Sequence, residues 1–61
     1  MNDPIELEYE GIRVKVAYLT GWEYDFFYGG NRYFAHYPFP DMAIEGAKET
    51  IRQLIANAGN P

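Results

Sequence analysis

Residues 5–18 read IELEYEGIRVKVAY, and apolar side chains alternate with charged ones on both sides of Gly11. Alternation with a period of two is typical of a β-strand that is buried on one face. The apolar positions change from odd to even numbers at this glycine, and a two-residue turn at Glu10-Gly11 explains the change. The segment therefore predicts a hairpin with strands over about 5–10 and 12–19.

The charged residues of this hairpin support its register. The turn pairs apolar residues on one face, namely Tyr9 with Ile12, Leu7 with Val14 and Ile5 with Val16. The pairs on the other face are Glu8 with Arg13 and Glu6 with Lys15. Unlike charges directly opposite each other stabilise an antiparallel sheet, so both polar pairs favour this register.

A third strand is predicted over residues 22–28, WEYDFFY, because four of its aromatic residues fall on one face. A three-residue loop at 19–21 sets Val16 beside Tyr24, whereas a two-residue turn would set Val16 opposite Asp25 and mix the two faces. The three-residue loop is therefore expected. The pairs that follow from it are Tyr18 with Trp22, Val16 with Tyr24, Lys15 with Asp25 and Val14 with Phe26.

A fourth strand is predicted over residues 32–37, after a turn formed from Gly29, Gly30 and Asn31. A two-residue loop at Gly30-Asn31 is expected, which leaves Arg32, Phe34 and His36 on the outer face. The pairs that follow are Tyr28 with Tyr33, Phe26 with Ala35, Tyr24 with Tyr37 and Trp22 with Phe39. A three-residue loop is the alternative and would turn Phe34 and His36 inward. Pro38 and Pro40 cannot donate ladder hydrogen bonds, so we expect them to end the sheet.

From Asp41 the apolar period changes to that of a helix, which we predict over about 41–58. The apolar stripe consists of Ile44, Ala47, Ile51, Leu54, Ile55 and Ala58. Asp41 is a suitable N-cap, and Gly59 is expected to end the helix in a left-handed conformation. Gly46 inside the helix costs about 1 kcal/mol relative to alanine, and close contact with an aromatic ring or a partner would explain it.

These elements predict an α+β fold, ββββα: a four-stranded antiparallel meander with one C-terminal helix packed on its aromatic face. The 61 residues leave room for a single small domain spanning residues 1–61. No segment remains to cover the other face of the sheet. We therefore expect function to reside on that uncovered face.

Composition excludes several classes of protein. Aromatic residues make up 18% of the chain and hydrophobic residues 48%, which is too apolar for a disordered segment. Cysteine and serine are both absent, so disulfides, thiolate sites and serine nucleophiles are excluded. No apolar run approaches the roughly 20 residues of a membrane span, and no secretory signal is evident. We expect a soluble, cytoplasmic protein with formal charge −4, no membrane contact and no cofactor.

One group of residues could carry chemistry. The expected register sets His36 opposite Asp25, with Glu23 two residues away, which suggests an acid–base pair or a metal site. Such a pair needs a nucleophile or bound water, and the two threonines lie elsewhere. We therefore interpret His36 as an exposed residue that pairs weakly with a carboxylate. Neither enzymatic activity nor a metal is expected.

A contact surface is the stronger candidate. The expected register makes Phe27 and Phe34 cross-strand neighbours on the uncovered face, and exposed phenylalanines there are typical of a binding surface. The candidate partner-binding residues are Phe27, Phe34, His36, Arg13, Glu23, Glu6 and Glu8. The glutamates at 6, 8 and 10 lie on an edge strand, where they either discourage strand addition or steer a basic partner.

Residues 21–34, GWEYDFFYGGNRYF, followed by the helix at Asp41, resemble the three-strands-plus-helix domains of the AP2 and phage-integrase arm-binding type. The likeness covers about residues 12–58 and implies a basic sheet that enters the major groove of DNA. Here carboxylates outnumber the basic residues of the sheet, so DNA phosphates would be repelled on balance.

The leading hypothesis is a non-enzymatic protein–protein interaction module that binds through its uncovered sheet face and acidic edge. Its size and charge would suit a small acidic phage or mobile-element inhibitor of a host protein, and a homodimer is compatible. The alternative hypothesis is a nucleic-acid-binding module, and nucleic acid is the less expected partner. Its phosphate contacts would be Arg13, Lys15, Arg32 and His36.

Overall fold

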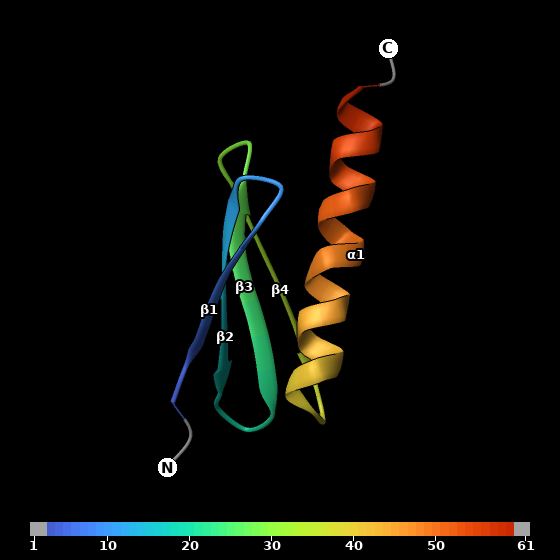
Figure 1. The fold of residues 1–61 in the computed structure, drawn as a ribbon. Coiled ribbons are helices and arrows are strands. Elements are labelled where there is room, and N and C mark those ends of the chain that lie inside the picture. Colours follow the sequence, from blue (N-terminus) through green and yellow to red (C-terminus); the bar gives the residue numbers. More distant parts are fainter. Residues whose placement is uncertain (1–2, 60–61) are drawn as a thin grey trace.

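The computed structural model describes residues 3–59 as four strands followed by one helix (Figure 1). The elements are β1 (Ile5–Tyr9), β2 (Ile12–Tyr18), β3 (Trp22–Tyr28), β4 (Asn31–Tyr37) and α1 (Pro40–Ala58). The strands form one antiparallel sheet in the order β1-β2-β3-β4. The predicted ββββα arrangement is confirmed.

The first hairpin has the predicted register, with Leu7 opposite Val14 and Glu6 opposite Lys15. Its turn places both Glu10, at φ 52°, and Gly11, at φ 76°, in the left-handed region. Two consecutive positive φ angles are typical of the type I′ turns that match the twist of a hairpin. The three-residue loop between β2 and β3 is also confirmed, because Tyr18 lies opposite Trp22.

Glu10 is strained in this turn, because left-handed backbone costs most residues about 1–2 kcal/mol while asparagine tolerates it better. The Glu10→Asn variant is therefore expected to gain roughly 0.5–1 kcal/mol in free energy of unfolding. Urea unfolding with an unchanged m-value would measure this gain. Glu10→Gln removes the same charge but keeps the strain, so equal gains in both variants would contradict the backbone explanation.

The register between β3 and β4 differs from the predicted one by two residues. The two-residue turn lies at Gly29-Gly30, with φ angles of 60° and 82°, and not at Gly30-Asn31. Glycine adopts positive φ without strain at both turn positions, which explains why this pair forms the turn. The observed pairs include Trp22 with Tyr37, Glu23 with His36, Asp25 with Phe34 and Phe27 with Arg32. A shift of two keeps every side chain on its predicted face.

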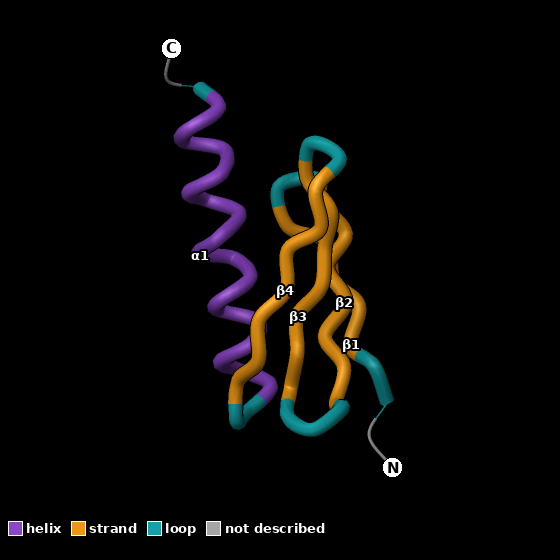
Figure 2. The backbone as a smooth tube through the Cα atoms, turned by 180° about the vertical axis from the view of Figure 1, so that it is seen from behind, coloured by secondary structure: helices purple, strands orange, loops and turns teal. Residues whose placement is uncertain are grey.

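The core lies between α1 and the inner face of the sheet. Figure 2 shows the helix on the β4 side of the sheet, farthest from β1, and its packing is mainly against β3 and β4. The buried apolar residues are Val14, Val16, Tyr24, Phe26, Ala43, Ala47 and Ile51. Ala43 is buried although the predicted stripe omitted it, and Ile55 and Ala58 are exposed although the stripe included them.

The predicted N-cap is wrong, and the predicted C-cap, Gly59, is right in position but not in conformation. The N-cap is Phe39, without a side-chain hydrogen bond, and Pro40 occupies the first helical turn. Proline suits this position because its fixed φ is helical and its missing N–H needs no partner there. Asp41 consequently lies inside the first turn, where its carboxylate still interacts favourably with the helix dipole. Gly59 has φ −84°, a right-handed conformation, so the helix ends without a left-handed residue.

Polar contacts attach α1 to the sheet. The Tyr24 hydroxyl lies 3.0 Å from Thr50 Oγ1, and Thr50 Oγ1 donates to the Gly46 carbonyl at 2.9 Å. At the β1 edge, Arg52 donates to the Tyr9 hydroxyl at 3.0 Å. Tyr9 therefore connects the edge strand to a helix that otherwise packs on β2, β3 and β4.

Candidate interaction surface

The outer side of the sheet is not covered by any segment of residues 3–59, because α1 lies on the other side (Figures 1 and 2). We call this side the open sheet face. Its residues are Glu6, Glu8, Arg13, Lys15, Ala17, Glu23, Asp25, Phe27, Arg32, Phe34 and His36. The predicted division of the strands into an inner and an outer face is confirmed.

Two phenylalanines are the main apolar groups of the open sheet face. Phe27 is 66% exposed and Phe34 is 53% exposed. The prediction that they lie directly opposite each other is wrong, because Phe27 faces Arg32 and Phe34 faces Asp25. The Arg32 guanidinium carbon lies 4.6 Å from the centroid of the Phe34 ring, a distance at which the cation and the ring attract.

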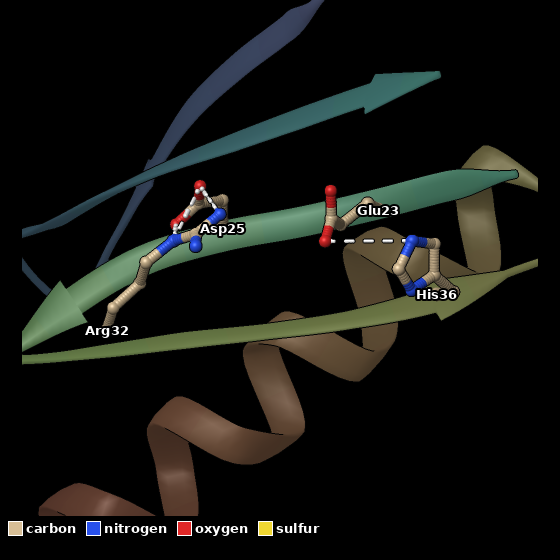
Figure 3. A network of polar contacts seen from close by, with 4 residues as sticks. All are labelled: Glu23, Asp25, Arg32 and His36. Carbon is tan, nitrogen blue, oxygen red and sulfur yellow. Dashed lines mark hydrogen bonds and ion pairs between the residues drawn. The ribbon is translucent and has the colours of Figure 1, made fainter. Parts of the chain in front are cut away.

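An ion pair between β3 and β4 fixes Arg32 in this position. Arg32 Nε donates to Asp25 Oδ1 at 3.1 Å, and one terminal nitrogen donates to Oδ2 at 2.8 Å (Figure 3). The Asp25 carboxylate raises the pKa of Arg32 through these hydrogen bonds and through its charge. Paired donation of this kind gives a guanidinium a defined orientation. The pair therefore holds a positive charge over the Phe34 ring.

A second pair joins the same two strands. His36 Nε2 lies 3.7 Å from a carboxylate oxygen of Glu23, and the two form an ion pair when the histidine is protonated (Figure 3). The prediction that His36 faces Asp25 is therefore wrong. Glu23 is only 9% exposed, so its carboxylate is turned toward the histidine and away from solvent. In residues 3–59, no three His, Asp or Glu side chains come together as a metal site would require.

A shallow hollow of about 440 Å³ lies over β2, between Phe27 and the edge strand. It is lined by Glu6, Arg13, Lys15, Asp25, Phe26 and Phe27. The expected pairs Glu6–Lys15 and Glu8–Arg13 are in register, but the ion pairs found within the described residues include neither Arg13 nor Lys15. Two basic side chains in the hollow are thus available to another molecule.

The charges of the open sheet face follow the strands. The carboxylates lie on β1 (Glu6, Glu8) and β3 (Glu23, Asp25), and the basic residues lie on β2 (Arg13, Lys15) and β4 (Arg32, His36). The sign therefore alternates from strand to strand across the sheet. With His36 neutral, the face has four carboxylates and three positive charges. Its net charge is therefore −1, out of −4 for the whole chain.

The seven predicted partner-binding residues all lie on this face. Lys15, Asp25 and Arg32, which were predicted on the outer face but not among the partner-binding residues, lie on it as well. The unlike charges of Asp25 and Arg32 were a signal in the sequence, but only the observed register brings them within reach of each other.

No protein-family model, no curated protein and no solved structure matches this chain. No helix in the described part of the chain is both long and apolar enough to cross a bilayer. What the protein does is therefore inferred from its own residues and their geometry.

Proposed function

We propose that the chain is a non-enzymatic protein–protein interaction module that binds through the open sheet face. The observation that carries this proposal is the exposure of Phe27 and Phe34 beside ordered charges, on a face that the described chain leaves bare. Burying one exposed phenylalanine side chain contributes about 1.5–3 kcal/mol. Two such rings surrounded by polar groups have the composition of a binding centre with a polar rim.

The arrangement of charges supports a protein partner over a nucleic acid. Phosphates bind where basic side chains cluster, because each contact releases counterions from the backbone. On the open sheet face, the carboxylates of β1 and β3 flank the basic column of β2, and Asp25 already neutralises Arg32. A row of phosphates would therefore meet negative charge on both sides of Arg13 and Lys15.

The glutamates of the acidic edge are expected to affect the rate of association with a partner more than the affinity. Glu6, Glu8 and Glu10 are exposed on or beside β1, where charges discourage the addition of another strand. Rim charges of this kind change association rates and their dependence on salt. The narrower expectation of a phage or mobile-element inhibitor rests on size and charge alone and stays a prediction.

The Phe27→Asp variant is expected to abolish complex formation while the fold survives, because a carboxylate replaces the most exposed ring of the face. Sedimentation velocity of the purified chain and pull-down with the tagged chain measure the loss. Circular dichroism checks the fold. Met42→Asp is the matched control, since Met42 is 47% exposed on α1, outside the open sheet face. The control is expected to behave as the wild type.

Two results would contradict the proposal. The first is unchanged sedimentation and pull-down for Phe27→Asp. The second is binding to labelled DNA or RNA that falls steeply with salt and is lost in Lys15→Gln, which would favour the nucleic-acid function.

A further inference from the structure

We propose that the occupant of the open sheet face is a second copy of the same chain, packed face to face about a two-fold axis parallel to the strands. This inference rests on the proposed function and names its partner. The alternating charges of the four strands carry it. A face that attracts itself must place each positive column over a negative one.

Only one of the two possible two-fold axes in the plane of the face meets this condition. An axis perpendicular to the strands would lay each strand over its own equivalent, so that like charges would meet. An axis parallel to the strands, between β2 and β3, lays β1 over β4 and β2 over β3 of the second copy. The sign order from β1 to β4 is negative, positive, negative, positive, so each acidic strand then lies over a basic strand, although Glu6 itself lies over Phe34.

The registers of the sheet give the residues that meet. Glu6, Lys15, Asp25 and Phe34 lie in one row across the strands. Rotation about the proposed axis keeps rows aligned, so Lys15 faces Asp25 of the second copy, and Asp25 faces its Lys15. These two equivalent pairs lie beside the axis. The strands of two packed sheets cross at about 30°, so corresponding residues of the two copies stay aligned best near the axis.

The position of Phe27 fits the same arrangement. Beyond this row, Glu8 lies opposite Arg13 and Phe27 lies opposite Arg32, and Arg13 and Phe27 both line the hollow between β2 and β3. The rotation places Phe27 of the second copy over β2, at the hollow of about 440 Å³ that Arg13 and Lys15 line. Each copy therefore supplies both an exposed ring and the hollow that receives it. The ring would lie against the Arg13 guanidinium, a favourable cation–aromatic contact.

The size of the face sets the expected strength. A standard interface buries about 800 Å² of accessible surface on each partner. That is about a fifth of the 4332 Å² surface of this chain, so the dimer would use the whole open sheet face. We therefore expect a reversible dimer with a dissociation constant in the micromolar range, and burial of Phe27 and Phe34 on dimerisation.

Two charge variants test the axis when they are mixed. In a dimer of Lys15→Asp, the new aspartate of each copy faces Asp25 of the other copy. In a dimer of Asp25→Lys, the new lysine of each copy faces Lys15 of the other copy. Each variant alone is expected to dimerise at least about tenfold more weakly than the wild type, because close charge pairs across an interface are strongly coupled. An equimolar mixture restores both unlike pairs, and a heterodimer is expected at concentrations where each variant alone is monomeric.

Sedimentation velocity and native mass spectrometry, from about 10 µM to about 1 mM as the expected micromolar constant requires, distinguish the species. Circular dichroism confirms that each variant is folded. Glu45→Lys is the control for charge, because Glu45 lies on α1, outside the open sheet face. It makes the same change in charge as Asp25→Lys and is expected to leave the dimer intact.

A wild-type chain that is monomeric over this range would overturn the dimer, as would a mixture that forms no heterodimer. Failure of the dimer can be distinguished from failure of the proposed function. If the wild type is monomeric but a pull-down complex is lost in Phe27→Asp and kept in Met42→Asp, the face binds another protein and only the dimer is wrong. If Phe27→Asp changes neither sedimentation nor pull-down, both proposals fail.

Discussion

Replacement of Phe26 by alanine is expected to leave the chain largely unfolded at 25 °C. Phe26 is only 2% exposed, and its ring stacks on Tyr24 and Tyr33 at centroid distances of 5.7 and 5.3 Å. Truncation of a buried phenylalanine to alanine costs about 3–5 kcal/mol. The single hydrophobic core of a domain this small rarely supplies more than about 3–5 kcal/mol, so the loss is comparable to the total.

Far-ultraviolet circular dichroism and urea unfolding would measure this effect. Phe27→Ala is a matched control, because it makes the same chemical change at the next residue of β3 but on the open sheet face. Its free energy of unfolding is expected to stay within about 0.5 kcal/mol of the wild type, as is usual for exposed positions. A Phe26→Ala variant that unfolds cooperatively with near wild-type stability would show that the core does not depend on this ring.

The second large effect is expected at Gly46, where alanine should destabilise the protein although it is the better helix former. A Cβ atom built on Gly46 would overlap the Tyr37 ring and its hydroxyl. Tyr37 cannot easily move aside, because its ring stacks on Tyr24 at 6.0 Å. Overpacking of this kind costs about 1–3 kcal/mol. That exceeds the helix propensity gain of about 1 kcal/mol.

A double-mutant cycle separates the two contributions at this site. In a Tyr37→Ala background the overlap is removed, so Gly46→Ala is expected to raise the free energy of unfolding by about 1 kcal/mol. The sign of the Gly46→Ala effect should therefore reverse between the two backgrounds, as urea unfolding would show. Destabilisation of equal size in both would mean that the ring of Tyr37 is not what the glycine accommodates.

The registers of the first two hairpins could be predicted because each had two independent constraints. A one-residue change of register would have moved Val16 from the apolar face to the polar one. It would also have broken the unlike charge pairs on the outer side, such as Glu6 with Lys15. Both constraints pointed to the same turn, so the alternation of residue types was sufficient.

The register of the third hairpin could not be predicted in the same way. A shift of two residues keeps every side chain on its face, so the alternation cannot detect it. The choice depended on which two of Gly29, Gly30 and Asn31 occupy the turn. Because that choice was wrong, the prediction paired His36 with Asp25, and the ion pair between Asp25 and Arg32 was missed.

The helix was predicted correctly as an element, but its buried side depends on a neighbour that the sequence does not specify. The predicted apolar stripe included Ile55 and Ala58, which are exposed, and omitted Ala43, which is buried. The buried positions follow Ala43 and Ala47, because small side chains let the helix approach the aromatic rings of β3 closely. The small size of Ala43 and Ala47, and not hydropathy alone, therefore decides which side of the helix packs on the sheet.

The position of α1 after all four strands has a consequence during synthesis. Each strand pairs with the one made just before it, so the sheet can assemble progressively as the nascent chain leaves the ribosome. Its tyrosine and phenylalanine rings stay uncovered until residues 40–58 emerge. A translation product that stops before Pro40 would keep these rings in contact with water and would be a substrate for chaperones and proteases.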